Sequence, residues 1–473
     1  MKISFIAHAS ILVEAHGISI LSDPWWHGPC FGAQWWLYPS PYLEPITGQK
    51  IDYIYISHGH HDHFHPATLK TFARTTKVLI REGLDFCEPI RQLGFEVIEV
   101  PDNQDVNLGS ASQPLTCRIL YTHNDDTLMT ISDGREVCLN LNDAVHALPK
   151  KQRTGFTQLL RNLYPQIDYV FCGYGTASHF PNCYVVPGKD REKTAAKRQS
   201  HFNHVWANIV HELSPRFAFP FAANVVFLED DLFWANEPVH NSERPTTVFS
   251  HAHPEAFTHA IDIAPGFVIE NGAVISPRLW TPVSSNELRT SLGDSIRRVN
   301  RVSRVDGTSV REVAALIAAN TVRHASYLRT FPGDYSCLIE LRDAVEAIKV
   351  TKKGPQILVT TVTDEPLNEG DYDLVYTTRL SYLRRSLTTP YGNEILFVGS
   401  GGIFRYPQQH KITTNVHREL MVAIKKWDHP LRRDPGVTGG VITSAKQLVK
   451  HFLGYKTEDL YDLQTWSVFS PQS

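Results

Sequence analysis

The chain has 473 residues, a length that accommodates two or three domains. Its hydrophobic content of 42% and charged content of 20% are those of an ordinary globular protein, which excludes a disordered or fibrous chain. The net charge of −3 gives no bulk attraction for nucleic acid or for an anionic membrane, so we expect neither as a partner.

The seven cysteine residues are odd in number and scattered, and no Cys-x-x-Cys pair occurs. A disulfide scaffold is therefore not expected, and a reducing compartment suits the chain better. The N-terminus enters a strand pattern without a signal segment, and no apolar run reaches the length of about eighteen residues that a membrane span needs. We expect a cytoplasmic protein that is a monomer or a homodimer.

Strands are predicted at residues 2–7, 10–15 and 18–21, with a turn at Gly17 and a strand end at Asp23-Pro24. A tryptophan cluster follows, with Trp25-Trp26 and Trp35-Trp36 inside twelve residues. Four such large apolar side chains are too many for a solvated loop. They either close a core or form the wall of a pocket.

An apolar run from Ile51 to Ile56, rich in β-branched and aromatic residues, predicts a buried strand. Four histidine residues and one aspartate follow within six positions, as His58-Gly59-His60-His61-Asp62-His63. Imidazole nitrogen and carboxylate oxygen suit zinc, iron or manganese, and a loop after a strand can fold several of them around one ion. A histidine-rich surface loop without metal is the plain alternative, but the preceding strand favours the metal site.

This His-x-His-x-Asp-His pattern resembles the signature of the metallo-β-lactamase superfamily. The resemblance implies that His58 and His60 bind one metal ion and that Asp62 and His63 bind a second. Two other histidines, His61 and His65, match no ligand position of that signature.

The first strands add to this resemblance. His8-Ala9-Ser10, followed by a strand that ends in Asp23-Pro24, is similar to the lactonase-like branch of the superfamily. That similarity implies that His8 and Asp23 lie near the metal loop. A plain turn role for Asp23-Pro24 is the alternative.

Helices predicted at 66–72 and 85–93 alternate with strands at 77–80 and 95–100, as an α/β layered domain requires. A strand at 117–122 is followed by His123, and a hairpin across Asp133-Gly134 ends at Asn142-Asp143. These strand ends match the next ligand positions of the superfamily. The resemblance implies that His123 completes the first site and that Asp143 bridges the two ions; a capping or surface role is the alternative for each.

A narrower resemblance rests on Asp-Pro-Trp at 23–25, Gly-Pro-x-Phe at 28–31 and Trp-Trp-Leu at 35–37. These motifs look like the metal domain of CMP-N-acetylneuraminate hydroxylases, which use oxygen and electrons passed through a Rieske domain. In those enzymes a loop ending in Phe-Pro, here Phe180-Pro181, lines the pocket. This chain lacks the Cys-x-His and Cys-x-x-His arrangement of a Rieske site, so the electrons would come from an external electron-donor protein or from a second iron.

The strand predicted at 217–222 departs from the hydrolytic branch, which usually has Pro-x-His there and uses that histidine as the last ligand of the second site. The chain has Pro220-Phe221-Ala222, as the hydroxylase-like proteins do. The second site is then weaker, absent or completed by another side chain. The side chains that could replace the missing histidine ligand are Asn224, Asn236, His240, His251 and His253. For each of them a solvated loop role is the simpler interpretation.

We expect an α/β metallo-β-lactamase αββα sandwich over residues 1–285 and a smaller α+β domain over 286–473, joined by a polar stretch near 285–305. In the second part, helices are predicted at 309–328, 379–386 and 415–426, and strands at 335–341, 356–363, 372–378 and 395–398. This arrangement is similar to sterol-carrier-like domains. Such a domain would cover the site, bind substrate or make a dimer contact.

Three functions remain open. The altered second site favours a non-haem iron oxygenase or hydroxylase that acts on a small polar metabolite such as a sugar or nucleotide derivative. A zinc- or manganese-dependent hydrolase cleaving a lactone, amide or phosphodiester is the second, and a metal-free binding protein the third. For either enzyme we expect one or two metal ions, iron before zinc or manganese, with Asp62, His63 and Asp143 as catalytic residues.

Overall fold

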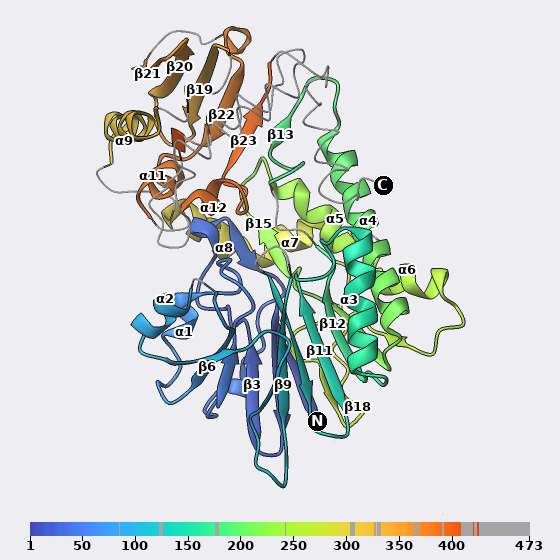
Figure 1. The fold of residues 1–473 in the computed structure, drawn as a ribbon. Coiled ribbons are helices and arrows are strands. Elements are labelled where there is room, and N and C mark those ends of the chain that lie inside the picture. Colours follow the sequence, from blue (N-terminus) through green and yellow to red (C-terminus); the bar gives the residue numbers. More distant parts are fainter. Residues whose placement is uncertain are drawn as a thin grey trace.

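The structure is a computed structural model that describes residues 1–407, with gaps at 85, 123–125, 176–178, 242, 303–307, 326–327, 329–332, 364–367 and 390–391, and residues 420, 423 and 424. In Figure 1 two large sheets face each other in the lower half of the molecule, and a third sheet stands above them. Helices cover the outer faces of the facing pair. The N-terminal part is therefore an αββα sandwich, and the predicted fold class is confirmed.

The first sheet begins with antiparallel pairing of the N-terminal strands and continues as parallel strands from β3 onward. Helices α1 (Pro66–Leu69) and α2 (Cys87–Gln92) contribute Leu69 and Ile90 to an apolar cluster with its strands. In sheet order its strands are β18 (Ala273–Ser276), β17 (Val268–Glu270), β1 (Lys2–Ala7), β2 (Ser10–Ala15), β3 (Ile18–Ser22), β5 (Tyr53–Tyr55), β6 (Lys77–Arg81) and β7 (Glu96–Val100).

The second sheet combines an antiparallel meander with parallel strands. Helices α3 (Lys150–Leu163), α4 (Arg191–Leu213) and α6 (Pro245–Ala252) cover its outer face on the right of Figure 1. Its strands in sheet order are β16 (His259–Ala260), β14 (Phe217–Phe221), β12 (Tyr169–Gly173), β11 (Val137–Asn142), β10 (Thr127–Ser132), β9 (Thr116–Tyr121) and β8 (Asp105–Asn107).

The core between the two sheets is built from the inward side chains of both. Phe5, Ile11 and Leu79 come from the first sheet, and Phe171 and Phe219 come from the second. All five are at most 1% exposed. Burial on this scale is the main stabilising contribution to the sandwich and fixes how the strand ends of the two sheets meet.

The third sheet is formed largely by the C-terminal part, but its edge strand β13 (Tyr184–Val185) comes from the middle of the chain. Strand β13 is parallel to β23 (Gly402–Arg405), at the junction between the upper and lower parts of Figure 1. The remaining strands, in sheet order, are β22 (Leu374–Thr378), β19 (Tyr335–Leu341), β20 (Ala347–Lys353) and β21 (Gln356–Val362).

Helices α9 (Val310–Arg323) and α11 (Leu380–Thr388) pack with this sheet in one apolar cluster, which also contains Trp25, Phe31 and Trp35 from the N-terminal part. The domain boundary near residue 285 and the likeness to sterol-carrier domains stay predictions. The helix predicted at 415–426 lies largely outside the described residues. The other α-helices among the described residues are α5 (Asn236–Asn241), α7 (Ser285–Ser291), α8 (Gly293–Val302) and α12 (Gly392–Leu396).

The strand predicted at 395–398 was wrong, because this apolar run belongs to the end of helix α12 and the turn after it. Leu396 and Phe397 are buried, as they would also be in a core strand. A short apolar run does not distinguish a buried helix from a buried strand. The glycines that follow permit close packing: a Cβ at Gly399 would lie 2.5 Å from the Cβ of Phe31.

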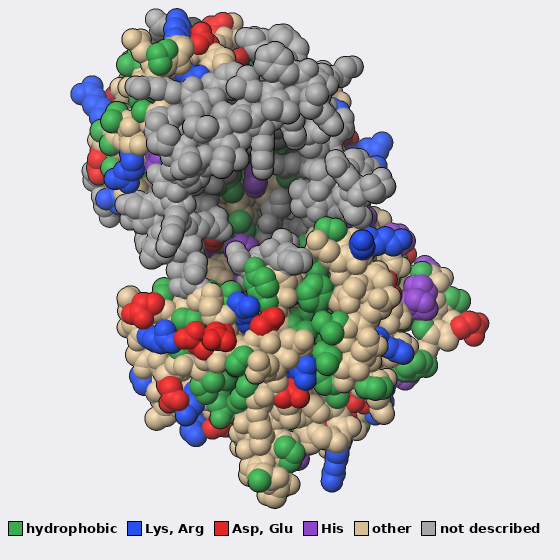
Figure 2. Space-filling view, viewed as in Figure 1, with side chains coloured by type: hydrophobic (Ala, Val, Ile, Leu, Met, Phe, Trp, Pro, Cys, Tyr) green, Lys and Arg blue, Asp and Glu red, His purple; other side chains and the backbone are tan. Residues whose placement is uncertain are grey.

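The face of the molecule in Figure 2 carries charged side chains of both signs. On the side shown in Figure 2, Lys and Arg side chains are interspersed with Asp and Glu. None of the helices in the described ranges has the length and apolar character needed to cross a membrane. The seven cysteine residues all fall within those ranges, each is buried, and no disulfide joins them.

Candidate metal centre

Strands from both facing sheets end at one place, and their last residues carry the predicted site. His8 follows β1, Asp23 follows β3, and the metal loop follows β5. From the second sheet, Asp143 follows β11 and Ala222 follows β14. The sandwich therefore brings together residues from five separate segments of the described chain, as the resemblance implied for His8 and Asp23.

The ligand atoms of these residues gather in two overlapping groups, in each of which they lie within 4.8 Å of one another. One group is His58, His63 and Asp143, and the other is His8, Asp62 and His63. His63 Nε2 belongs to both, at 3.2 Å from Asp62 Oδ2 and 3.5 Å from Asp143 Oδ2. The metal loop is thus the centre of the cluster.

His60 joins the cluster through His58, because His60 Nδ1 lies 2.8 Å from His58 Nε2. The same His58 nitrogen is 3.6 Å from Asp126 Oδ1, a carboxylate that sequence reasoning did not select. Only its position just after the predicted His123 could have drawn attention to it. His123 itself lies outside the described residues, so its role as a third ligand of the first site stays a prediction.

Asp23 fixes the metal loop by contacts with Ser57 and His63. Its carboxylate is fully buried and accepts hydrogen bonds from the Ser57 backbone N–H and hydroxyl, both at 2.8 Å. His63 Nδ1 lies 3.1 Å from Asp23 Oδ2, and the Asn142 amide also donates to that oxygen. A carboxylate on one ring nitrogen orients the other nitrogen toward a metal, so Asp23 is a positioning residue rather than a simple turn residue.

Burial controls the charge of the first pair of histidines. It lowers the pKa of His58 and of His60 to about 4, with the neighbouring His63 and His58, respectively, adding to the effect. Both imidazoles are therefore neutral near pH 7. A neutral imidazole has the free lone pair that a metal ion requires.

The second pair is ionised instead. Burial lowers the pKa of His63, but Asp62, Asp143 and Asp23 outweigh burial and raise it well above its usual range. Burial raises the pKa of the Asp62 carboxyl, but His63 and His8 outweigh it and bring it well below its usual range. The pKa of Asp143 is lowered in the same way, mainly by His63.

Asp126 behaves differently from these two carboxylates. Burial raises the pKa of its carboxyl to about 6, and the charge of Asp143 adds to this while His60 opposes it. Asp126 is therefore the carboxylate of this cluster whose protonation state changes closest to neutral pH. A metal ion beside it would favour the charged form.

The donor set fits a metal ion. Asp62 Oδ1 is buried without a hydrogen-bond partner in the described structure, which is costly unless something else satisfies it, and His63 Nε2 has only its ion-pair contacts with Asp62 and Asp143. Two ligand atoms at about 2.1 Å from one ion, at cis or tetrahedral angles, lie roughly 3.0–3.4 Å apart. The distances from Asp62 Oδ2 to His63 Nε2 and to His8 Nε2, 3.2 and 3.1 Å, fall in that range.

The backbone at these strand ends is strained. His8, Asp23, Asn142 and Ala222 all have positive φ, between 37° and 57°, a region that non-glycine residues rarely adopt. Such conformations persist where the surrounding structure imposes them, and they gather at functional sites. The strain accompanies the convergence of the strand ends on one centre.

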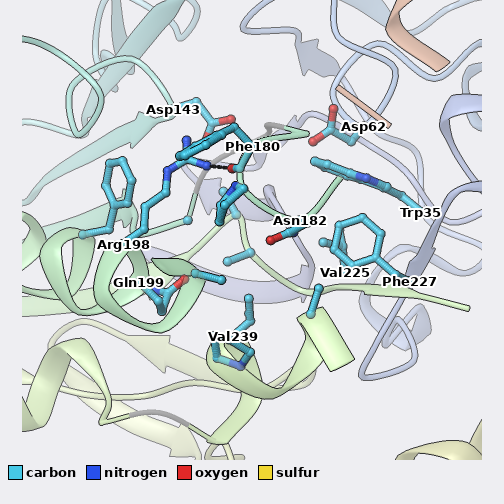
Figure 3. Close-up of a pocket in the computed structure, with 18 of the residues that line it drawn as sticks. Trp35, Asp62, Asp143, Phe180, Asn182, Arg198, Gln199, Val225, Phe227 and Val239 are labelled. Atoms are coloured by element: carbon cyan, nitrogen blue, oxygen red, sulfur yellow. Dashed lines mark hydrogen bonds between the residues drawn. The ribbon is translucent and has the colours of Figure 1, made fainter. Parts of the chain in front are cut away.

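A cavity opens onto the cluster (Figure 3). Its wall includes Asp62 and Asp143 at the metal-loop end, and the buried Arg198 guanidinium, which donates to the Phe180 carbonyl. Burial lowers the pKa of Arg198 to about 9. The other side chains of this wall that bear on recognition are aromatic or polar: Trp35, Phe180, Phe227, Asn182 and Gln199.

The tryptophan cluster serves both purposes that the sequence left open. Trp25, Trp35 and Trp36 are at most 6% exposed and belong to apolar clusters. Trp35 also lines the cavity, from strand β4 (Trp35–Leu37), which pairs with β15 (Val225–Phe227) beside the end of β14. Phe180 lines the same cavity, as the resemblance implied for the loop ending in Phe-Pro.

The remaining histidines of the loop have structural contacts. His65 caps helix α1 by accepting a hydrogen bond from the Thr68 backbone N–H, and His61 stacks on Phe31 with ring centroids 5.1 Å apart. Of the proposed substitutes for the missing ligand, His251 has a side chain 76% exposed and His253 stacks on His211. The Asn236 amide bonds the backbone of Phe227.

For two of the candidate replacement ligands, Asn224 and His240, no structural contact of this kind is described. Asn224 is buried at 4% exposed, and the side chain of His240 lies outside the described residues. Beside Asp62 and His63 the described structure has His8 instead, which was not among the predicted substitutes. The sequence signals for His8 were its place at the end of a strand and the resemblance of His8-Ala9-Ser10 to the lactonase-like branch.

Comparison with known proteins agrees with this fold. Residues 2–130 match the family described as the β-lactamase superfamily domain. A protein from Mycolicibacterium smegmatis named for a Rieske 2Fe-2S iron–sulfur centre is 24% identical over 243 residues, which are 49% of this chain and 45% of that protein. The chain thus spans about half the length of such curated relatives.

The cytidine monophosphate-N-acetylneuraminic acid hydroxylase of Cricetulus griseus is 38% identical over 77 residues, 16% of this chain and 13% of that enzyme. Among solved structures, the metallo hydrolase Igni18 from Ignicoccus hospitalis has 17% identity and a TM-score of 0.40, covering 57% of this chain and 97% of its own. A variant of the CmlA β-hydroxylase has 19% identity and a TM-score of 0.37, and the match covers 57% of this chain and 53% of the hydroxylase chain. Over residues 2–130 the chain therefore matches the β-lactamase superfamily domain, and it is similar to a segment of the hydroxylases.

Proposed function

We propose that this protein is a metal-dependent oxygenase that hydroxylates a small polar metabolite, such as a sugar or nucleotide derivative, with iron held by the histidine and carboxylate cluster. One observation carries the proposal: residues able to hold a metal, Asp62 and Asp143, also form the wall of a cavity of aromatic and polar side chains. A bound molecule would therefore meet the metal site directly.

Two further observations favour oxygen chemistry over hydrolysis. The relatives by sequence include a hydroxylase and proteins named for a Rieske 2Fe-2S iron–sulfur centre. The difference from the hydrolytic branch also falls on the site itself, because Ala222 presents only a methyl group to the cavity beside Asp62. The chain shares this feature with the hydroxylase-like proteins.

The side chains of the cavity have distinct roles in this proposal. Trp35, Phe180 and Phe227 offer ring faces for a sugar or base, while Asn182 and Gln199 offer hydrogen-bonding groups. Asp23 and Ser57 keep the His63 ring in position. Asp126, whose charged form a metal ion would favour, adds a carboxylate oxygen 3.6 Å from His58 Nε2.

Bound iron would supply the activation of dioxygen. One oxygen atom would enter a C–H bond of the substrate and the other would leave as water. Two electrons and two protons are needed for balance. We propose that an external electron-donor protein supplies the electrons, which is the role a Rieske domain has in the resembled hydroxylases.

The test combines metal analysis with isotope tracing. Protein purified without oxygen should contain near two irons per chain, and with a reductant and labelled dioxygen it should transfer label into one member of a panel of sugar nucleotides. His58→Ala should lose most of the metal and all label transfer while it remains folded, because His58 lies in a loop outside the sheet core.

The alternative is a zinc- or manganese-dependent hydrolase. It is favoured by the ionised Asp62, whose Oδ1 is buried and has no hydrogen-bond partner in the described structure, so that it is available to accept a proton from a bound water. A single zinc per chain, together with cleavage of a lactone, amide or phosphodiester without oxygen, would establish the hydrolase and contradict the oxygenase.

A further inference from the structure

We infer that His8 is a ligand of the second metal ion, where it supplies the imidazole that strand β14 lacks at Ala222. This inference rests on the proposed function only in requiring two metal ions. It assigns the second ion three protein ligands, Asp62, His63 and His8, of which His63 also belongs to the group with His58 and Asp143.

The distances support a shared ion. His8 Nε2 lies 3.1 Å from Asp62 Oδ2, and Asp62 Oδ2 lies 3.2 Å from His63 Nε2. Ligand atoms held at about 2.1 Å from one ion are separated by roughly 3.0–3.4 Å. Two of the three separations therefore match those of ligands on one ion, and the third, between the His8 and His63 ligand atoms, is at most 4.8 Å.

Their burial supports the same assignment. His8 and Asp62 are each 2% exposed, and His63 is fully buried. Asp62 Oδ1 and His63 Nε2 find no hydrogen-bond partner in the described part of the chain, although both are polar atoms enclosed by protein. An ion between these side chains would give the buried Asp62 Oδ1 a partner and would take the place of the ion pair between His63 Nε2 and Asp62.

The position of His8 explains how it can replace a ligand on β14. The Ala222 backbone N–H donates to the His8 carbonyl over 2.9 Å, so the end of β1 and the end of β14 lie against each other. A histidine at position 8 and a histidine at position 222 would therefore be attached to adjacent parts of the backbone. The ligand has moved from one sheet to the other while its place in the site is kept.

The His8 ring is fixed for this role. It meets Trp25 edge to face with ring centroids 5.3 Å apart, and the His8 backbone has a φ of 45°. A strained backbone that directs a buried side chain toward a cluster of ligands is typical of a functional site. A plain ion pair between His8 and Asp62 is the competing explanation, and the metal-binding experiment separates the two.

The experiment measures binding of Fe(II) alone, without oxygen or substrate, and in parallel of Zn(II), by titration calorimetry with elemental analysis. The variant is His8→Asn, because asparagine tolerates positive φ. The control is His65→Asn, since His65 is also buried and also contacts Trp25, at 6.3 Å between ring centroids, but is not part of either ligand group.

Unmodified protein and the His65→Asn control should bind two ions. His8→Asn should keep the first and bind the second about tenfold or more weakly. The double variant His8→Asn with Ala222→His should regain the second ion, because it restores an imidazole from the neighbouring strand. No turnover is needed, so two ions without hydroxylation would overturn the proposed function and leave this inference standing.

Three results would overturn the inference: a single ion in the unmodified protein, unchanged binding of both ions by His8→Asn, or an equal loss of both. Should His8→Asn fail to fold, as judged by circular dichroism, Ala222→His alone decides. If His8 already fills the place, the added imidazole brings no gain in affinity for the second ion, whereas a gain of about tenfold or more would show that the place was vacant.

Discussion

Asp23 shows how much of this site depends on a residue that would not itself touch a metal ion. Its two oxygens accept hydrogen bonds from Ser57 and Asn142 and lie beside His63, so one buried carboxylate joins both sheets and the metal loop. With Asp23 on Nδ1, the His63 ring presents Nε2 to Asp62 and Asp143. Carboxylates in this position raise the basicity of the ligand and fix its orientation.

Replacing Asp23 by Asn should therefore lower metal affinity about 10–100-fold while the fold is kept, because the amide has the same shape but only one acceptor oxygen. The measurement is a competition titration with a chromophoric chelator. Asp52→Asn is the matched control: Asp52 also bonds a serine, Ser19, but lies away from the cluster. Equal affinities for Asp23→Asn and the control would show that His63 does not need this support.

At the scale of elements, helix α1 depends on a histidine as its N-cap. His65 Nδ1 accepts a hydrogen bond from the Thr68 backbone N–H at 3.2 Å, which only an unprotonated nitrogen can do. Burial lowers the pKa of His65 to about 4, with the charge of His61 adding to the effect. The unfolded chain binds this proton near pH 6.5, so the contribution of His65 to stability is complete above that pH and is lost as the pH falls toward 4.

Metal-free His65→Asn should keep the cap, since asparagine accepts the same hydrogen bond but does not titrate. Relative to the unmodified protein, its free energy of unfolding should fall less between pH 7 and pH 4, by on the order of 2–3 kcal/mol. Urea denaturation at several pH values measures this difference. The exposed His251→Asn is the control, and a pH dependence in His65→Asn equal to that of the unmodified protein would contradict the role of His65 as a cap.

Sequence patterns predicted the elements that have strong periodicity and clear ends. The strands that carry His58 and Asp143 were placed correctly, because apolar runs with turn signals define both. Strand β20 was missed, since its alternation of Lys349, Thr351 and Lys353 with buried residues reads as a polar stretch. The approach of His8 to Asp62 could not be derived from local pattern, because it depends on which strand ends the two sheets bring together.

For the whole molecule, the junction between the sandwich and the third sheet contains a buried ion-pair network. The Glu229 carboxylate, 6% exposed, accepts hydrogen bonds from Arg379 Nε and Nη2 at 2.8 and 2.9 Å and from the Tyr382 hydroxyl. Arg342 Nη1 is 3.5 Å from the same carboxylate. Removing one partner of such a network leaves uncompensated buried charge.

Glu229→Ala should therefore destabilise the protein by about 3–5 kcal/mol, measured by urea denaturation. The double variant Glu229→Ala with Arg379→Ala should lose less than the sum of the two single variants, because each charge is costly chiefly when the other is absent. Asp230→Ala is the control, because it breaks an exposed ion pair in which the Asp230 side chain is 94% exposed and the Arg289 side chain 43%. It should change the free energy of unfolding by less than about 1 kcal/mol. Strict additivity in the double variant would contradict the network.

Strand β13 has a consequence for how the gene encoding this protein can change. Tyr184 pairs with Phe404, so the third sheet includes a strand encoded far upstream of the others. During synthesis Tyr184 leaves the ribosome long before Phe404, so strand β13 cannot pair until the C-terminal part has been made. A recombination event near the predicted boundary at residue 285 would transfer a sheet without its edge strand and leave behind a segment without its partner, so the two parts of the chain are expected to be inherited together.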